Sequence, residues 1–293
     1  MKILLPIDGS RYSDMAVSFL ASIASNLGEK PQVRVIVVVP AVPQRAILVT
    51  DTDQVHTYYE DEAQPLLTSA YERLSAVGYD VQTVYSIGSP GHHICHEAES
   101  FDADLIVMGS QGKSDLSGLF LGSVTREVLS GTKVPILVLR TSPRIEHSPI
   151  RIGIALDGSE QGIAASAYAL SNRKMFGKCL FYLIHVSPEI RKVIMPMGMP
   201  QLEENEIKKQ RMKEFACATK GVRSLFDDYN VVPRTVPLTG TPGEAIADFA
   251  AEEKLDLLIL GSHGDGRFKA PFTGSTANHL VSHTDIPLLV IRV

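Results

Sequence analysis

Two glycine-rich segments with the same spacing are the residues best suited to hold a ligand. The first consists of Gly109, Gly112, Gly122 and Ser123, and the second of Gly261, Gly264, Gly274 and Ser275. Glycine lets the backbone turn sharply or come close to a bound group. The free N–H groups and partial positive charge at the start of a following helix favour a phosphate, and each serine adds a hydroxyl donor. Helix capping with ordinary loop glycines is the alternative for either segment alone. Because the nine intervening residues differ between the copies while the spacing is kept, the pattern predicts two phosphate-binding loops.

An aspartate follows the first apolar run of each copy, in Ile7-Asp8-Gly9-Ser10 and Leu156-Asp157-Gly158-Ser159. A carboxylate beside a polyphosphate repels it unless a cation intervenes or the carboxylate accepts a ribose hydroxyl instead, so Mg²⁺ is a candidate companion ion. Capping of the first helix is the alternative role for Asp8.

Other motifs indicate little chemistry. His92, Cys95 and His96 have the i, i+3, i+4 spacing of metal ligands, but the matching segment of the second copy, which starts at Gly243, carries no such residues. We therefore predict no metal site there. A P-loop is excluded because Val107 stands where its first glycine belongs. Neither copy carries a nucleophile elbow or a lysine placed for phosphoryl transfer, so we expect no catalytic residue.

The chain is a tandem duplication. Early landmarks recur at an offset of 149 residues, and later landmarks such as Gly88 and Gly240 recur at 152. The segment between the copies has two prolines and no periodicity, which indicates a linker. We expect one domain over 1–140, a linker over 141–149 and a second domain over 150–293.

Strand and helix patterns alternate within each copy. Short β-branched runs predict five strands per copy, at 2–7, 33–39, 81–85, 105–108 and 136–139, and at 152–156, 179–186, 231–236, 257–260 and 288–291. An apolar stripe over 16–27 predicts the first helix, ended by Gly28, and the segment 203–229 predicts a long helix that buries Tyr229. The order implies α/β domains with mainly parallel sheets, whose ligands bind beyond the carboxyl ends of the strands.

Composition narrows the class of protein. Apolar residues make up 44% of the 293 residues, and 28 basic against 33 acidic residues leave a net charge of −5. Nucleic acid is therefore not an expected partner. Three scattered cysteines fit a reducing compartment. Apolar runs are too short to cross a membrane, so a cytoplasmic protein is expected.

A strand ending in Asp-Gly-Ser, followed after the fourth strand by G-x-x-G, nine residues and G-[ST], resembles the ATP-binding branch of the universal stress protein family. The resemblance covers the whole chain, twice. It implies two tandem Rossmann-like (adenine nucleotide alpha hydrolase-like) domains, each with a five-stranded parallel sheet of order 3-2-1-4-5 flanked by helices.

The resemblance also implies the residues that contact the nucleotide, which is ATP, AMP or ADP. In the first copy these are Pro6, Ile7, Asp8, Val38, Met108, Gly109, Gln111, Gly112, Gly122, Ser123 and Val124. In the second copy they are Ala155, Leu156, Asp157, Val186, Leu260, Gly261, His263, Gly264, Gly274, Ser275 and Thr276. The implied function is a nucleotide-responsive stress-adaptation and signalling module. A slow ATPase or autophosphorylating enzyme, with Ser123 or Ser275 receiving phosphate, and a scaffold with vestigial sites are the alternatives.

The resemblance implies that single-copy members of this family pair as dimers. The two linked halves of this chain are therefore expected to pack against each other as an intrachain pseudodimer. Pairing of whole chains and the identity of a protein partner stay open.

Overall fold

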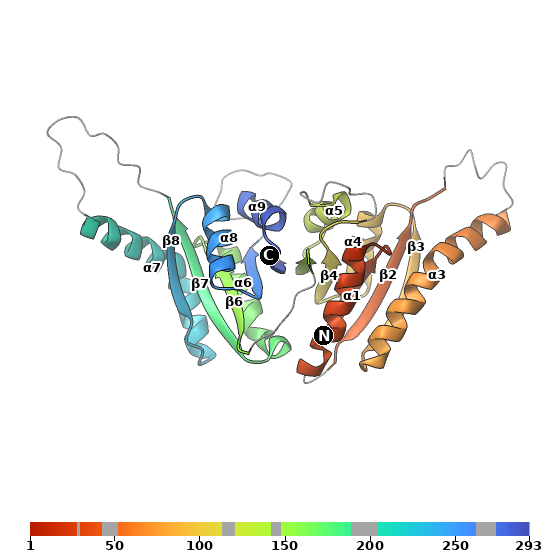
Figure 1. Ribbon diagram of the computed structural model, residues 1–293, viewed down its shortest axis with the longest axis horizontal. Helices are drawn as coiled ribbons and strands as arrows, with labels where there is room; N and C mark the ends of the chain where they lie inside the picture. Colours follow the sequence, from red (N-terminus) through yellow and green to blue (C-terminus); the bar gives the residue numbers. More distant parts are fainter. Residues whose placement is uncertain are drawn as a thin grey trace, which may run out of the picture.

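The computed structural model describes residues 1–27, 30–42, 52–112, 121–141, 148–188, 204–261 and 274–292. His263 and Gly264 of the second glycine segment, Gly28, and residues 142–147 of the expected linker therefore lie outside the described residues. Two α/β halves lie side by side, with α3 and α7 at opposite ends of the molecule (Figure 1).

The elements of the first half are β1 Lys2–Ile7, α1 Arg11–Ile23, η1 Ala24–Asn26, β2 Gln32–Val39, α3 Thr52–Ala76, β3 Asp80–Ile87, α4 Pro90–Ser100, β4 Leu105–Gly109, α5 Ser123–Gly131 and β5 Ile136–Leu139. Those of the second half are β6 Ile150–Ala155, α6 Glu160–Ser171, η2 Arg173–Phe176, β7 Cys179–Ser187, α7 Glu204–Asp228, β8 Arg234–Thr239, α8 Pro242–Glu252, β9 Leu257–Gly261, α9 Ser275–His283 and β10 Leu288–Ile291.

The ten strands of the described residues form one sheet of order β3-β2-β1-β4-β5-β10-β9-β6-β7-β8. Each half therefore has the order 3-2-1-4-5, and its strands are parallel throughout. The expected α/β fold is confirmed. Because β1 lies between β2 and β4, the carboxyl ends of these three strands meet at one edge, where the strand order reverses and ligands bind in such sheets.

Helices cover both faces of the sheet. Residues of α1, α3, α6 and α7 pack into one apolar layer, and residues of α4, α5, α8 and α9 into the other. The inner strands between them are buried on both sides, which explains their continuous β-branched runs, whereas the edge strands β3 and β8 are partly exposed. β1, for example, buries every residue from Ile3 to Ile7.

Two expectations about element ends and one about burial are corrected. Helix α1 stops at Ile23, and a 3₁₀ turn over η1 leads to an extended Leu27, because the chain must turn back to enter β2. Strand β8 starts at Arg234, three residues later than predicted, because Asn230 turns the chain after α7 at a positive φ of 52° and Pro233 has no N–H for the ladder. Tyr229 is 36% exposed and lies under the guanidinium of Arg173 at the surface.

The two halves are joined by an antiparallel pair of their last strands, β5 and β10. Leu137 pairs with Leu289, which is its own counterpart at the offset of 152. The junction therefore has a local two-fold relation between the copies.

Reciprocal arginines extend this relation. Arg140 donates to the carbonyl oxygens of Val281, at 3.1 Å, and Ser282 near the end of α9. Its counterpart Arg292 donates to the carbonyl oxygen of Leu129 near the end of α5, at 2.7 Å. Cations at helix carboxyl ends satisfy carbonyls that lack partners within the helix.

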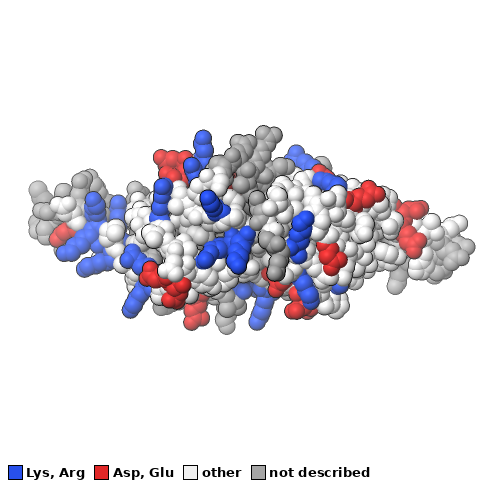
Figure 2. All heavy atoms as spheres, turned by 90° about the horizontal axis from the view of Figure 1, so that it is seen from below, with Lys and Arg blue, Asp and Glu red and all other residues white. Residues whose placement is uncertain are grey.

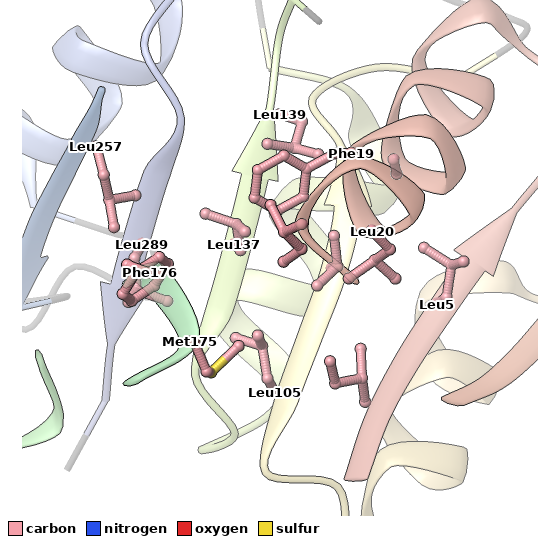
Figure 3. Packing of buried hydrophobic residues seen from close by; sticks show 14 of the residues in the cluster. Leu5, Phe19, Leu20, Leu105, Leu137, Leu139, Met175, Phe176, Leu257 and Leu289 are labelled. Atoms are coloured by element: carbon pink, nitrogen blue, oxygen red, sulfur yellow. The ribbon is translucent and has the colours of Figure 1, made fainter. Parts of the chain in front are cut away.

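Apolar side chains fill the junction on one face of the β5–β10 strand pair. Figure 3 shows Phe19 of α1 and Leu137 of β5 together with Met175 and Phe176 of η2 and Leu289 of β10. Each of these side chains is at most 9% exposed. The halves thus share one core at their boundary.

The surface seen in Figure 2 carries Lys and Arg side chains interspersed with Asp and Glu side chains. Among the helices of the described residues, none combines the length and apolar character needed to span a bilayer.

Candidate functional site

A cavity of about 430 Å³ lies in the first half, at the carboxyl ends of β1, β2 and β4. All eleven residues predicted for the first copy line it, together with residues of α3 and α4 that sequence reasoning missed. The structure thus brings the aspartate after β1, the end of β2 and the glycine segment after β4 to one place.

The helix that opens onto this cavity lacks a side-chain cap. Helix α5 begins after Gly122, which has no side chain to offer its N–H groups. At α1, by contrast, the Ser10 hydroxyl accepts from the N–H of Ser13, at 3.2 Å. Of these two helix starts, α5 is the one whose amides are left for a ligand.

Gly109 serves close packing of the backbone. A Cβ at this position would lie 2.6 Å from the Cβ of Tyr12 and 2.8 Å from its carbonyl carbon. At Gly261 a Cβ would lie 2.5 Å from the Cβ of Gln161, which is the matching place in α6. The first glycine of each motif therefore lets the first helix of its own half approach the sheet, which is a physical reason for glycine that needs no ligand.

Gly112 makes room for Asp8. A Cβ at Gly112 would lie 2.8 Å from Oδ2 of Asp8. The other carboxylate oxygen, Oδ1, accepts from the N–H of Ser10 at 2.9 Å. The N-cap of α1 is Ser10 and not Asp8, so the capping alternative for Asp8 is wrong. Its carboxylate instead lies beside Gly112 of the glycine segment.

Thr125 was missed by sequence reasoning and positions the start of α5. This buried hydroxyl donates to the carbonyl oxygens of Gly109 and Ser110, at 3.1 and 3.3 Å. The N–H of Gly122 also donates to the Ser110 carbonyl, at 2.9 Å. The second copy has Ala277 at this position, so the repeat gave no signal for it.

Helix α3 supplies a further wall. Tyr58, Glu62 and Leu66, spaced by four residues on one helix face, line the cavity opposite the end of β2. Figure 1 shows α3 lying beside β2 and β3. The wall therefore combines one aliphatic side chain with one carboxylate and one phenol.

The charge of the lining is negative. Asp8 and Glu62 contribute carboxylates, and no Lys, Arg or His is found among the described residues that line the cavity. An anionic ligand here would depend on the amides of α5 and on a cation that it brings with it.

The described site residues of the second half occupy equivalent places. Ala155, Leu156, Asp157, Val186, Leu260 and Gly261 lie at or just beyond the carboxyl ends of β6, β7 and β9, and Gly274, Ser275 and Thr276 form the start of α9. Gly274 is the N-cap of α9 and, like Gly122, provides no side-chain cap. Oδ1 of Asp157 accepts from the N–H of Ser159 at 3.0 Å, as at Asp8.

Polar groups replace valines at the end of the second strand in this half. His185 and Ser187 of β7 stand where β2 has Val37 and Val39. The His185 Nδ1 contacts the carbonyl oxygen of Leu156 at 2.8 Å. A hydrogen bond from Ser187 is the main cause of a lowered pKa at Glu214 of α7, followed by one from Gln210.

The histidines and cysteine of α4 are not assembled as ligands. No group of three or more His, Cys, Asp or Glu side chains is placed to hold a metal ion within the described part of the chain. The Sγ of Cys95 faces Gly131 of α5. Burial raises the pKa of this thiol to about 11, which disfavours the thiolate that binds metals.

Comparisons with a family model, with curated proteins and with solved structures all lead to the same family. The model of the universal stress protein family matches residues 1–140 and 150–292. A universal stress protein of Mycolicibacterium smegmatis is 26% identical over 302 residues, covering 99% of this chain and 96% of that protein. The crystal structure of a universal stress protein from Archaeoglobus fulgidus has a TM-score of 0.74 at 22% identity and covers 99% of this chain and 98% of that one, a likeness in fold. A universal stress protein solved in complex with cAMP covers 47% of this chain and 96% of that one, at 24% identity and a TM-score of 0.36.

Proposed function

The chain belongs to the universal stress protein family, and from this premise we propose that it is a tandem adenine-nucleotide-binding module that responds to ATP in stress adaptation. The observation that carries the proposal is the cavity of the first half, which all eleven predicted residues line. The second half would hold a second nucleotide at the ends of β6, β7 and β9.

The shape and polarity of the cavity support an adenine nucleotide. Its volume of about 430 Å³ lies within the usual range of small-molecule sites. Val37, Val39 and Leu66 offer apolar surface for a base near the end of β2. At the other side, the start of α5 and the Ser123 hydroxyl offer donors to phosphates.

The carboxylate of Asp8 fits a ribose hydroxyl or a Mg²⁺ ion. It lines the cavity beside the glycine segment, with Oδ1 accepting from the N–H of Ser10 and Oδ2 facing Gly112. Bound Mg²⁺ would offset the charge of the phosphates beside this carboxylate. We infer binding without efficient hydrolysis, because the described lining has no Lys, Arg or His to stabilise a transferring phosphoryl group.

Valine substitutions at the two N-cap glycines test the proposal. Gly122 has φ −60° and ψ 153°, and Gly274 has φ −53° and ψ 159°, which are conformations open to valine. The Gly122→Val variant should therefore keep the fold while its added side chain fills the phosphate end of the cavity. Titration calorimetry with Mg·ATP should show two sites in the unmodified chain, one in Gly122→Val or Gly274→Val, and none in the double variant.

Ser130→Ala, at the far end of α5, is the matched control and should bind like the unmodified chain. Unchanged ATP affinity in the double valine variant, or no ATP binding by the unmodified chain, would contradict the proposal.

A further inference from the structure

The two helices at the ends of the molecule carry opposite charge. Over residues 54–76, α3 has four acidic residues and one basic residue, Arg73, which pairs with Asp14 of α1. Over residues 208–223, α7 has six basic residues and one acidic residue. Figure 2 shows the same separation toward its two ends, with Lys and Arg side chains at the α7 end and Asp and Glu side chains at the α3 end. The chain is therefore basic at one end and acidic at the other.

The acidic residues of α3 include two on its outward face. The helix packs on the sheet through buried residues such as Ala63 and Leu67, and Asp61 and Glu72 are exposed on the opposite face. These two residues lie at the ends of a shallow groove along the helix surface, which is also lined by Gln64, Pro65, Thr68 and Ser69. Among the described residues that line it, the groove thus has two negative charges and no positive one.

The outward face of α7 has the reverse charge. This helix packs on the sheet through Phe215 and Val222, and Lys209 and Lys220 are exposed on the opposite side. Ala216, which is exposed between these lysines, is small, so a neighbouring helix can approach closely here.

The spacing of the charges also matches. Asp61 and Glu72 are 11 residues apart, and so are Lys209 and Lys220. Such a separation corresponds to about three helical turns, or about 16 Å. One helix lying along the other therefore sets each lysine beside a carboxylate, in either helix direction.

Exposed apolar residues gather at the same two ends of the molecule. Among the described residues, eight large apolar side chains are more than a third exposed, and all but Met1 belong to α3, β3, α7 or the segment that follows α7. Tyr71 of α3 is 47% exposed, and Met212 of α7 is 48% exposed. Apolar side chains within a charged surface are typical of sites where proteins associate.

The partner that fits both ends is a second copy of this chain. Helices α3 and α7 lie at opposite ends of one molecule (Figure 1), so they do not meet within it. We propose that α7 of one chain docks along the groove on α3 of the next, with Lys209 and Lys220 beside Asp61 and Glu72, and joins the chains head to tail. Because the contact uses two different surfaces, each end of the assembly keeps one surface free, and the assembly stays open.

The contact should be weak and sensitive to salt, because exposed ion pairs contribute little each and are screened by dissolved ions. Sedimentation velocity of the unmodified chain should show association that grows with protein concentration at about 0.1 M salt, where charges interact over about 10 Å. The association should be lost at about 1 M salt, where that distance falls to about 3 Å.

Charge reversal at the matched positions tests the pairing. Lys209→Glu with Lys220→Glu makes both ends acidic, and Asp61→Lys with Glu72→Lys makes both ends basic. Each double variant alone should associate at least about tenfold more weakly than the unmodified chain, because like charges then face each other. A mixture of the two variants should recover the association, which also shows that both are folded.

Two control variants carry the same net charges as the test variants. Lys174→Glu with Lys178→Glu, and Glu99→Lys with Glu252→Lys, reverse exposed residues outside α3 and α7. Each control should associate like the unmodified chain, and a mixture of the two controls should associate no more strongly than either one alone.

A single sedimenting species at every protein concentration, equal association in test and control variants, or no recovery in the mixture would each overturn the inference. Binding of the monomeric chain to phosphatidylserine vesicles, lost in Lys209→Glu with Lys220→Glu, would overturn it as well, because the outward face of α7 would then belong to an anionic membrane surface.

Discussion

At the residue scale, Asp8 and Ser10 have different roles just after the end of β1. Ser10 caps α1 through its hydroxyl, while Asp8 holds the N–H of Ser10 and turns its other oxygen toward Gly112. Both residue types cap helices well, so composition alone leaves the assignment open. The geometry resolves it, because only the Asp8 carboxylate reaches the glycine segment.

The cysteines should differ in reactivity. Burial, followed by the charges of Glu127 and Glu99, raises the pKa of Cys95 from 9.0 to about 11. A thiol with a raised pKa stays protonated until the pH approaches the new value, so its thiolate fraction near pH 8 falls about 100-fold. Iodoacetamide should therefore modify the exposed Cys217 long before Cys95, as followed by peptide mass spectrometry.

Labelling in denaturant supplies the control, since all three thiols should then react at similar rates. Equal labelling of Cys95 and Cys217 in the folded chain would show that Cys95 is not protected by burial.

At the element scale, the two copies stabilise the same helix–sheet contact with different residues. In the first half Arg34 of β2 donates to Gln82 of β3 and to Glu97 of α4, and lies 4.0 Å over the ring of Phe101. In the second half the position of Arg34 is held by Tyr182, which donates to Glu253 at 3.1 Å and accepts from Arg234. In both halves the donor at this strand position pairs with a glutamate, although the donor is an arginine in one half and a tyrosine in the other.

Loss of one partner of the first network should be costly. Arg34 and Glu97 are 23% and 17% exposed and pair at 2.7 Å, so Glu97→Ala leaves a largely buried guanidinium with one fewer acceptor. We expect the free energy of unfolding to fall by about 2 kcal/mol, less than for a fully buried pair. Urea denaturation followed by circular dichroism measures it.

The control is Asp102→Asn. Asp102 is 96% exposed and 3.9 Å from Lys2, and its positive φ of 55° suits asparagine. Its effect should stay within about 0.5 kcal/mol. Similar losses in both variants would mean that the Arg34 network adds no more than a surface ion pair.

At the same scale, hydrophobic periodicity predicted the existence of the strands far better than the element ends, whereas the sheet order 3-2-1-4-5 followed from the family resemblance. Runs such as Lys2–Ile7 are buried on both faces and read clearly in sequence. The late start of β8 depends on the positive φ of Asn230, which hydrophobic periodicity does not reveal, and on Pro233, which lacks an N–H for the ladder. The glycines and the strand-end aspartate of the first cavity were predictable because the repeat preserves their spacing, and the other predicted lining residues followed from the family resemblance. The wall from α3 was not, because α3 and α7 have diverged at all but one position and periodicity does not tell which strand ends a helix covers.

At the scale of the whole molecule, the junction connects the two candidate sites. Helix α5 starts at the cavity of the first half, and its end is held by Arg292 from the second half. Arg140 holds the end of α9 in the same way. The two helices whose first amides would face the proposed ligand are therefore fixed at their other ends by the opposite half.

Removal of these arginines should loosen the junction. Arg140→Ala and Arg292→Ala should each lower the free energy of unfolding by about 1 to 2 kcal/mol, as expected for hydrogen bonds from a charged donor. Arg126→Ala, an exposed arginine of α5, should change it by less than about 0.5 kcal/mol. Thermal unfolding of the three variants side by side measures the difference, and equal midpoints would contradict a role for the reciprocal arginines.

The most direct measurement is a crystal structure of the intact chain grown with excess Mg·ATP. The account predicts a nucleotide in the cavity of the first half, with the base between the end of β2 and α3, the ribose or a metal ion at Asp8, and the phosphates at the start of α5. A cavity without nucleotide, or a nucleotide bound elsewhere on the chain, would contradict it.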